Sequence, residues 1–252
     1  MKVLLVATVQ SHICQFHRPL VAMLHGHGCE VHVAARNNLA EKNGLKLDFV
    51  ERVFDVPFQR SPFSPKNLGA YKQLKKIIGE GSYDVIHCNT PVGGVVGRLA
   101  ARKSRKRGTK VFYTAHGFHF YKGAPKKNWL IWYPVEKFMC RHTDKLITIT
   151  QEDYDLASAK FPTQVERIHG VGANSAKYHK LSEAECAALR CELGYAEGEK
   201  ILLCTGELLP NKNQITAIRA MKTLIEHQPK AKLLLAGNGP TLPELQAEVT
   251  AL

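Results

Sequence analysis

Residues 85–103, VIHCNTPVGGVVGRLAARK, show the repeating unit of this chain in its clearest form. The short apolar run Val85–Cys88 is followed by a loop with paired glycines and then by an amphipathic stretch from Gly94 to Lys103. A short apolar run between turn residues indicates a buried strand, and the amphipathic stretch indicates a helix. The segment therefore predicts one strand–helix unit of an α/β sheet.

The same alternation continues on both sides of this segment. The expected strands are Val3–Ala7, Glu30–Ala34, Val85–Cys88, Lys110–Thr114, Lys145–Ile149 and Val165–Ile168, and the expected helices are Phe16–His25, Pro65–Ile78, Gly94–Lys103, Asn128–Cys140 and Glu152–Lys160. The strands are apolar throughout, as in parallel sheets that helices cover on both faces. This alternation predicts an open, doubly wound α/β domain.

A change of composition near Gly170 predicts the end of this first domain. Two glycines and small polar residues at 170–175 suit a linker. A polar helix is expected to follow, beginning after Ser182, where Glu185 completes a capping box, and ending at Leu193.

Strand–helix alternation resumes at Lys200. The expected elements are strand Ile201–Thr205, helix Gln214–His227, strand Lys232–Ala236 and a helix from Leu242 onward. We predict an N-terminal domain at residues 1–170, a linker and connecting helix at 171–199, and an incomplete C-terminal domain at 200–252. Because two strand–helix units are smaller than an independent domain, we expect a fragment or a fold that a partner completes.

Charge and cysteine content limit the classes of function. The seven cysteines are dispersed without a C-x-x-C, which predicts reduced, buried thiols in a cytoplasm, Cys204 among them, rather than zinc or disulfides. The apolar run Val3–Val9 is too short to span a bilayer, and export is not expected. A net charge of +13 and the basic stretch Arg98–Lys110 predict attraction to phosphates, with a merely solvated face as the alternative.

Ligands of open α/β sheets bind beyond the carboxyl ends of the strands. After the first expected strand, Ser11 and His12 lie in a polar loop that can hold an anionic or hydroxyl-rich group. No glycine-rich dinucleotide fingerprint is present, so NAD is not expected. Thr90, Gly93 and Gly94 follow the third expected strand. Paired glycines there let a ligand approach the backbone closely, or let a helix pack tightly on the sheet.

His116 follows the expected strand Lys110–Thr114 and precedes Gly117. A histidine at this place can donate a hydrogen bond to a substrate hydroxyl, and a purely structural role is the alternative. His119 is close in sequence, but no carboxylate or third ligand accompanies the pair, so no metal site is expected.

The C-terminal segment carries two glycine loops at neighbouring strand ends. Gly206 permits a tight turn, and Lys212 and Asn213 directly precede a helix, where the ammonium can neutralise a diphosphate. Gly237 and Gly239 form the second loop. Together the loops suit a nucleotide diphosphate, and ordinary turns are the alternative.

Four stretches resemble the retaining GT-B glycosyltransferases of family 4, especially their bacterial capsule and exopolysaccharide branch. They are Asn89–Arg98 (NTPVGGVVGR), Thr114–Tyr121 (TAHGFHFY), Thr205–Gln214 (TGELLPNKNQ) and Leu235–Pro240 (LAGNGP). The run from 126 to 154 is also typical of that branch. The resemblance spans essentially the whole chain and implies a GT-B fold, with the first two strand–helix units of a second, Rossmann-like domain after residue 200.

The resemblance also implies roles for particular residues. The first domain would bind the acceptor and the second the nucleotide sugar, with the reaction in the cleft between them. His116 would contact the donor sugar, and Lys212, near Gly206, the donor diphosphate. Glu207 stands where many members have an arginine and is not expected to bind phosphate. Transfer would retain configuration without a metal or cofactor, and a UDP-sugar is the expected co-substrate.

A pair of glutamates that contacts the donor in this family lies beyond residue 252, so these 252 residues are expected to transfer sugar poorly or not at all. Members of the branch usually extend a saccharide on a polyprenyl diphosphate at the cytoplasmic face of the membrane. Residues 122–145 mix tryptophans and other apolar residues with six cations, which suits lipid headgroups. We expect peripheral attachment to the anionic inner face through Asn128–Cys140 and Arg98–Lys110, unless the apolar residues face the sheet.

Other interpretations compete with this one. A UDP-sugar 2-epimerase uses the same two-domain scaffold, although the Thr205–Gln214 stretch argues against it. A non-catalytic fragment that binds the acceptor is the second alternative. Nucleic acid is not an expected partner, because no recognised module accompanies the basic residues.

Overall fold

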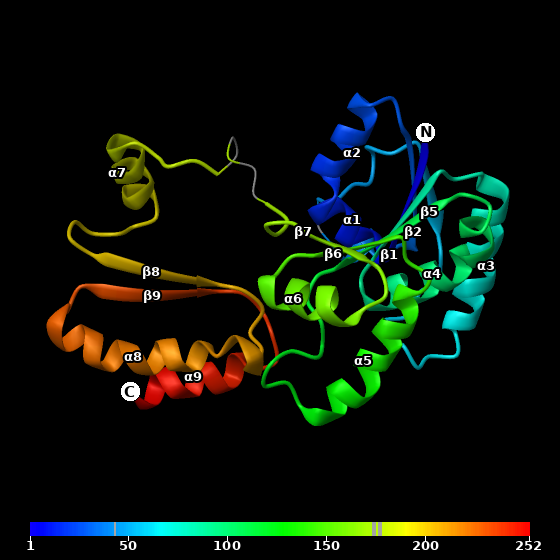
Figure 1. The fold of residues 1–252 in the computed structure, drawn as a ribbon. Helices are drawn as coiled ribbons and strands as arrows, with labels where there is room; N and C mark the ends of the chain where they lie inside the picture. Colours follow the sequence, from blue (N-terminus) through cyan, green and yellow to red (C-terminus); the bar gives the residue numbers. More distant parts are fainter. Residues whose placement is uncertain (43, 173–174, 176–177) are drawn as a thin grey trace. The chain divides into compact units, whose positions relative to one another are not determined.

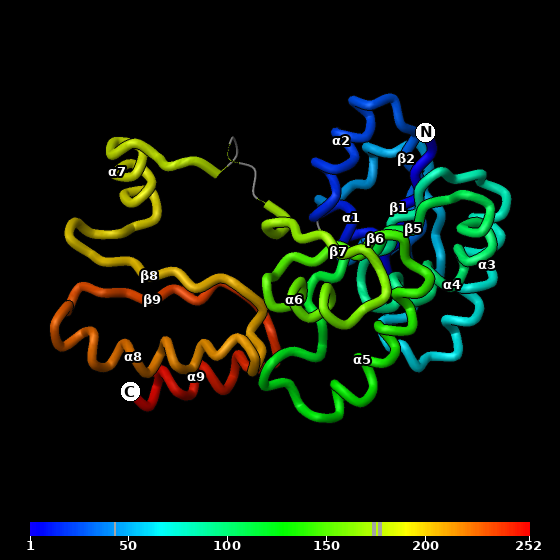
Figure 2. Tube along the Cα trace, in the orientation of Figure 1, coloured from blue at the N-terminus to red at the C-terminus, as the bar shows by residue number. Residues whose placement is uncertain are grey.

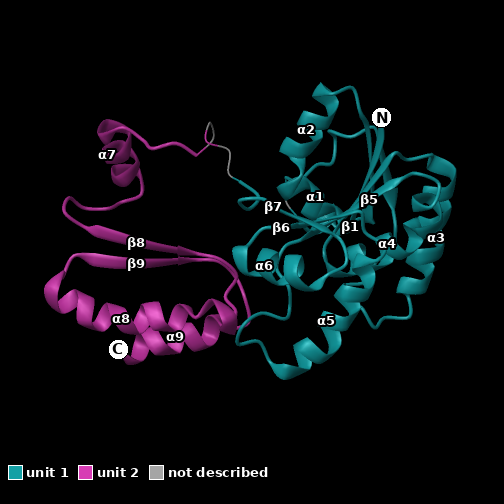
Figure 3. Ribbon diagram, in the orientation of Figure 1, with its two compact units in different colours: residues 1–173 teal, residues 174–252 magenta. Residues whose placement is uncertain are grey.

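The computed structural model describes residues 1–42, 44–172, 175 and 178–252 of the chain. The chain divides into two compact units, residues 1–173 (unit 1) and residues 174–252 (unit 2), as Figure 3 shows. Each unit contains its own parallel sheet.

A sheet of seven parallel strands forms the centre of the described part of unit 1 (Figures 1 and 2). The strands are β1 (Lys2–Val9), β2 (Glu30–Arg36), β3 (Arg52–Asp55), β4 (Val85–Asn89), β5 (Lys110–Ala115), β6 (Lys145–Thr148) and β7 (Gln164–Arg167). Their order in the sheet is β3-β2-β1-β4-β5-β6-β7. Successive strands are thus added on one side from β1 to β3 and on the other side from β4 to β7, and the order switches between β1 and β4. In open sheets a ligand crevice lies at such a switch point, beyond the carboxyl ends of the strands.

Helices cover both faces of this sheet, as predicted. They are α1 (Gln10–Phe16), α2 (Arg18–Gly26), α3 (Asn67–Gly81), α4 (Pro91–Arg105), α5 (Lys126–Cys140) and α6 (Gln151–Lys160), with a short 3-10 turn, η1, at Leu39–Glu41. One buried cluster joins Leu4 and Val6 of β1 to α3, α4 and α6. A second cluster joins Val3 and Leu5 to α1 and α2. Successive side chains of β1 point to opposite faces, so this strand contributes to both clusters.

The expectation for the segment after β1 is wrong. Instead of one helix over Phe16–His25, the structure has α1 and α2, and α1 already begins at Gln10. Ser11 and His12 therefore lie in the first turn of a helix and not in a loop. Pro19 lies at the start of α2, where its missing N–H is tolerated, but it cannot continue α1.

Strand β3 was also not predicted from the sequence. It has four residues, lies at the edge of the sheet, and most of its side chains are exposed, so no apolar run marks it. The other expected strands and helices are present with slightly different ends.

Helix α4 packs very close to the sheet through its glycines. A Cβ atom added to Gly93 would lie 3.0 Å from backbone atoms of Ala7 in β1, and one added to Gly94 would lie 2.4 Å from the ring of Tyr113 in β5. The paired glycines thus take the tight-packing role, which was the alternative to ligand contact.

We predict opposite effects of alanine at two glycines in neighbouring helices. Gly94→Ala forces the new methyl group into the Tyr113 ring and should lower the free energy of unfolding by about 1–3 kcal/mol. Gly79→Ala in α3 is the matched control, because its Cβ atom meets open space, and it should be neutral or stabilising by up to about 1 kcal/mol. Urea unfolding of both variants measures the difference. Equal effects would contradict the close packing of α4.

Unit 2 contains a parallel pair, β8 (Lys200–Thr205) and β9 (Ala231–Ala236). Its helices are α7 (Glu183–Glu192), α8 (Gln214–His227) and α9 (Leu242–Ala251), with a 3-10 turn, η2, at Pro210–Lys212. The predicted capping box is present: the Ser182 hydroxyl accepts from the Glu185 N–H, and the Glu185 carboxylate accepts from the Ser182 N–H.

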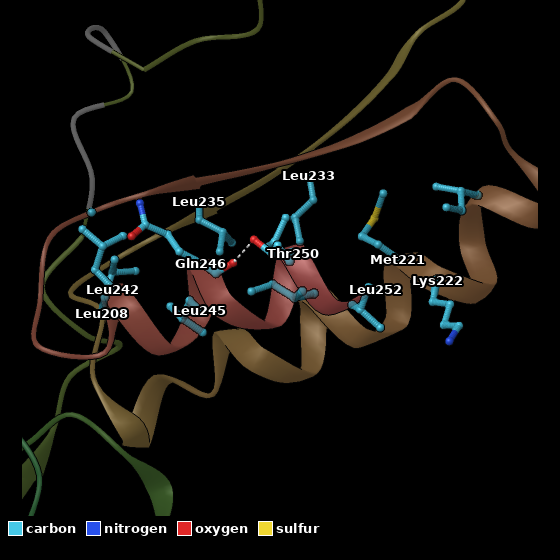
Figure 4. Close-up of a pocket in the computed structure, with 14 residues that line it drawn as sticks. Leu208, Met221, Lys222, Leu233, Leu235, Leu242, Leu245, Gln246, Thr250 and Leu252 are labelled. Carbon is cyan, nitrogen blue, oxygen red and sulfur yellow. Dashed lines mark hydrogen bonds between the residues drawn. The ribbon is translucent and has the colours of Figure 1, made fainter.

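Apolar side chains of unit 2 line an open groove of about 770 Å³ between β9, α8 and α9 (Figure 4). Leu233 and Leu235 of β9 form one wall, and Leu245 of α9 lies opposite them. On β8, Leu203 is 64% exposed, and Cys204, which was expected to be buried, is only half-buried. The strands of unit 2 are apolar in sequence, yet the described helices leave part of their surface uncovered.

Candidate functional site

The switch point of unit 1 brings several predicted site residues to one edge of the sheet. His12 follows β1, Thr90 follows β4 and His116 follows β5, and these strands are neighbours in the order β1-β4-β5. Parallel strands end at the same edge, so residues far apart in sequence meet there.

Four imidazole rings gather at this edge and are called the histidine cluster here: His12, His17, His87 and His116. The ring centroids of His12 and His116 are 4.8 Å apart in an edge-on arrangement. His17 lies 5.3 Å from His12, 6.5 Å from His116 and 6.1 Å from His87. His12 and His116 were predicted from the sequence, whereas His17 and His87 were not.

Hydrogen bonds hold the inner members of the cluster. The side chain of Asn89 is fully buried and bonds His17 Nε2 through its Oδ1 atom at 3.0 Å. His87 Nε2 lies 2.8 Å from the hydroxyl of Thr114. In contrast, the Nε2 atoms of His12 and His116 are buried without a hydrogen-bond partner among the described residues. Unpaired buried polar atoms are costly, so these two nitrogens suit a ligand that bonds them.

Burial keeps the cluster uncharged. Burial, with smaller effects of neighbouring His17 and His116, lowers the pKa of His12 from 6.5 to about 3, and the same causes lower the pKa of His87 to about 3. Burial and then His17 lower the pKa of His116. Burial also lowers the pKa of His17, and the hydrogen bond that its ring donates to Asn89 Oδ1 acts in the opposite direction. A neutral imidazole has one donor and one acceptor, which matches a sugar hydroxyl.

Two other predicted residues of this edge have internal partners. Ser11 is buried, and its N–H and hydroxyl bond the Asn38 side chain at 3.1 and 2.9 Å. Thr90 has a backbone φ of 63°, and its hydroxyl lies 2.7 Å from that of Thr8. These side chains shape the edge of the sheet, and direct contact of either with substrate stays a prediction.

The amides of the paired glycines are also used within the chain. The Gly93 N–H donates to the Thr8 hydroxyl at 3.3 Å, and the Gly94 N–H donates to the Thr90 carbonyl at 2.7 Å. With their Cα atoms packed on the sheet, these two glycines position α4 and do not offer open backbone to a ligand. The structure thus gives both glycines a packing role, and their contact with substrate stays a prediction.

The two glycine loops of unit 2 lie against each other at the carboxyl ends of β8 and β9. A Cβ atom on Gly237 would lie 1.8 Å from the Gly206 carbonyl oxygen, and one on Gly239 would lie 2.1 Å from the Leu208 carbonyl oxygen. The Leu208 N–H donates to the Asn238 carbonyl at 3.0 Å. Gly237 and Gly239 thus allow the loops to touch.

Gly206 differs from these two glycines. Its φ of 150° disfavours other residues, and a Cβ atom there would meet nothing within 4 Å. Its missing side chain therefore leaves open space at the end of β8, as close approach of a ligand requires.

Lys212 and Asn213 lie directly before α8. Lys212 is exposed at the end of the 3-10 turn η2, and Asn213 is the N-cap of α8 with a left-handed φ of 54°. The buried Gln214 donates to the Glu207 carbonyl at 3.0 Å, which fixes the turn after Gly206. A cation beside a helix N-terminus favours an anionic group.

The described residues contain no group of three or more His, Cys, Asp or Glu side chains placed to hold a metal ion. The histidine cluster is therefore not assigned as a metal site. Within the described chain, no helix is long and apolar enough to cross a membrane.

The basic stretch Arg98–Lys110 is less exposed than expected. Arg98 is fully buried, pairs with Glu136 of α5, and lies 3.9 Å from the centroid of the Tyr113 ring. Arg105 forms a two-pronged ion pair with Asp144 at 3.0 and 3.1 Å. Only the remaining cations of the stretch, among them Arg102 and Lys103, are exposed without such pairing to carboxylates.

Helix α5 has two different faces. Trp129, Trp132 and Tyr133 pack against the core, so these aromatic side chains are not the free membrane anchors that residues 122–145 suggest. Leu130 and Phe138 are 79% and 50% exposed on the same helix. The outer face thus combines apolar side chains with exposed lysines at 126, 127 and 137.

Comparison with known proteins agrees with this architecture. The parallel α/β units are those of the GT-B glycosyltransferase fold. The glycosyl transferase 4-like family matches residues 2–150, and the glycosyl transferases group 1 family matches residues 187–252. The chain belongs to the glycosyl transferase 4-like family.

Two relatives illustrate the membership. EpsD of Bacillus subtilis, assigned as a glycosyltransferase, is 47% identical over 240 residues, which cover 94% of this chain and 61% of that protein. The UDP-Gal:α-D-GlcNAc-diphosphoundecaprenol α-1,3-galactosyltransferase of Escherichia coli is 26% identical over 83% of this chain and 56% of its own length. The chain thus spans less than two thirds of either relative.

Solved structures share the fold. A glycosyltransferase from Rickettsia africae matches with a TM-score of 0.67 and 14% identity over 99% of this chain and 64% of its own. A UDP-N-acetylglucosamine 2-epimerase from Listeria monocytogenes matches with a TM-score of 0.63 and 13% identity over 99% and 65%. At such identities the likeness concerns the fold alone, and the epimerase match does not assign an activity.

We predict that the histidine cluster makes unit 1 sensitive to acid. The pKa values are lower in the folded than in the unfolded chain, so below about pH 6.5 the unfolded chain binds protons that the folded chain does not, and stability falls as the pH falls. Each such histidine contributes up to about 1.4 kcal/mol per pH unit, a limit reached well below pH 6.5. Urea unfolding between about pH 7 and pH 5 measures this slope.

His87→Gln should reduce the average slope over this range by about 1 kcal/mol per pH unit, because one buried imidazole is lost. His27→Gln removes an exposed histidine and serves as the control, with no change expected. An unchanged slope in His87→Gln would mean that His87 titrates alike in the folded and unfolded chain.

Proposed function

We propose that this chain takes part in transferring a sugar from a UDP-sugar to a saccharide carried on a polyprenyl diphosphate at an anionic membrane surface. The observation that carries the proposal is a pair of buried Nε2 atoms, on His12 and His116 at the switch point of unit 1, that have no hydrogen-bond partner among the described residues. Transfer with retained configuration and without a metal follows the family resemblance. Unit 1 would bind the acceptor and unit 2 the nucleotide sugar, and His116 of unit 1 would also contact the donor sugar, as the family resemblance implies.

The donor assignment is supported by the loops of unit 2. Gly206 leaves open space beside the N-terminus of α8, and Lys212 supplies an exposed ammonium there. Without a metal, the charge of a leaving diphosphate must be met by cations and backbone N–H groups. Glu207 has no such role in the proposal.

The acceptor assignment is supported by the neutral site and by the outer face of α5. Uncharged imidazoles recognise hydroxyl groups, and the name of the Escherichia coli relative states a GlcNAc-diphosphoundecaprenol acceptor. A lipid-linked acceptor requires contact with the membrane. The exposed Leu130 and Phe138, together with Lys126, Lys127 and Lys137, suit an anionic interface and a peripheral, cytoplasmic-face location.

Lys212→Ala should weaken the binding of UDP about tenfold or more, because a charge-assisted bond to the diphosphate is lost. Isothermal titration with UDP measures the affinity. Lys222→Ala removes an exposed cation from the second half of α8 and is the matched control, with little change expected. Equal losses in both variants would reduce the role of Lys212 to general attraction, and no UDP binding by the chain would contradict the donor assignment.

Replacing both Leu130 and Phe138 by serine should weaken sedimentation with phosphatidylglycerol vesicles at least about tenfold, because burying one such side chain contributes about 1.5–3 kcal/mol. Leu189→Ser on α7 also removes an exposed leucine and should have no effect. Binding should decrease with added salt, because the lysine contribution is screened. Equal sedimentation with neutral and anionic vesicles would contradict attachment through the lysines.

A further inference from the structure

Unit 1 contains a small, partly open cavity that has no role in the proposed reaction as described so far. Its walls come from α4, from β5 and the loop after it, and from α5, and its volume is about 40 Å³. Apolar and aromatic side chains dominate the lining, among them Val95, Phe118, Phe120 and Trp132. Tyr113 and Glu136 are polar members of the same lining.

The cavity adjoins the candidate substrate site. Gly117 and Phe118 line it, and His116, whose Nε2 atom has no partner among the described residues, directly precedes them in the chain. The wall of the cavity therefore begins one residue after His116. Trp132 lies 5.3 Å from the exposed His119 ring and 6.0 Å from the exposed Phe63 ring, measured between ring centroids. These rings provide aromatic surface beside the cavity.

The volume limits what can enter. One water-sized group needs about 10–15 Å³, so a cavity of about 40 Å³ has room for only a few heavy atoms. A pyranose ring or an isoprene unit is too large. The carbonyl carbon, carbonyl oxygen and methyl carbon of an acetamido group are three heavy atoms, and they project from a sugar ring that stays outside.

The lining also matches the chemistry of an acetamido group. Its methyl group suits the apolar walls that Phe118 and Phe120 provide, since these rings stack 4.7 Å apart and are buried. Glu136 uses one carboxylate oxygen for Arg98, and a carboxylate has further acceptor capacity for an amide N–H. Burial raises the pKa of Tyr113, so its hydroxyl remains a donor, as an amide carbonyl requires.

We propose that this cavity is a specificity pocket for the acetamido group of an N-acetylhexosamine acceptor, held beside His116. The inference rests on the proposed acceptor role of unit 1. It adds the chemical class of the acceptor sugar and the residues that select it.

The direct test uses two soluble probes that differ only at the sugar C2 substituent: phenoxyundecyl-diphosphate carrying α-D-GlcNAc, and the same carrier with α-D-glucose. Titration of the 252-residue chain should give at least about tenfold tighter binding of the GlcNAc probe, because filling or leaving empty such a pocket changes affinity by this order. In saturation-transfer NMR the acetyl methyl protons should receive the strongest signal.

A pair of variants tests the location of the pocket. A probe with an N-butanoyl group has two extra carbons and should bind the native chain at least about tenfold more weakly than the N-acetyl probe. Val95→Ala removes two carbons from the lining and should restore binding of the N-butanoyl probe. Val96→Ala makes the same change one residue further along α4, at a buried position that does not line the cavity, and should not restore it.

The outcomes separate this inference from the function on which it rests. Equal binding of the GlcNAc and glucose probes would overturn the acetamido pocket and leave the lipid-linked acceptor role standing. Restoration by Val96→Ala as well as Val95→Ala would overturn the assignment to this cavity. Binding of no probe would overturn the acceptor role itself and the inference with it.

Discussion

The site of unit 1 depends on the junction between the end of β1 and the start of α4. The Thr90 hydroxyl accepts a hydrogen bond from the Thr8 N–H at 3.0 Å and also forms a hydrogen bond with the Thr8 hydroxyl. The Thr8 hydroxyl accepts a further hydrogen bond from the Gly93 N–H. This network holds Thr90 at a φ of 63°, a conformation that side chains other than glycine rarely adopt. Because β1, β4 and β5 pair in parallel, they end side by side, and the imidazoles of His12 and His116, which follow β1 and β5, come into contact.

Much of the fold was predictable from the sequence, because short apolar runs and amphipathic stretches alternate along the chain and indicate strands and helices directly. The contents of the site were less predictable. His87 and Asn89 belong to a strand that reads simply as apolar, and His17 stands at the break between two helices that the pattern joins into one. Their importance follows from the strand order, which places β1 beside β4, and strand order is a long-range property that local patterns do not contain.

Residue type was also an incomplete guide to role. Arg98 belongs to a basic run and yet is buried against Glu136 and the Tyr113 ring, where its charge is neutralised within the chain. Gly93, Gly94, Gly237 and Gly239 resemble ligand-binding glycines, but in each the missing side chain makes room for other protein atoms. Gly206 alone of the predicted glycines leaves open space. Only the surroundings of a glycine or an arginine distinguish packing from binding.

The distribution of charge explains why shape must decide the acceptor in the proposed reaction. The histidine cluster is uncharged, and a neutral imidazole accepts or donates to any suitably placed hydroxyl, so it distinguishes poorly between sugars that differ at one position. In the proposed reaction, the lysines of helix α5 and Lys212 would recognise membrane charge or phosphate and would not distinguish one sugar from another. Discrimination between acceptor sugars then depends on close packing of the sugar substituents against the protein, because a single misplaced methyl group is costly in a close-packed site. The proposed cavity of about 40 Å³, which begins one residue after His116, would supply such a contact, because Phe118 and Phe120 in its wall are buried.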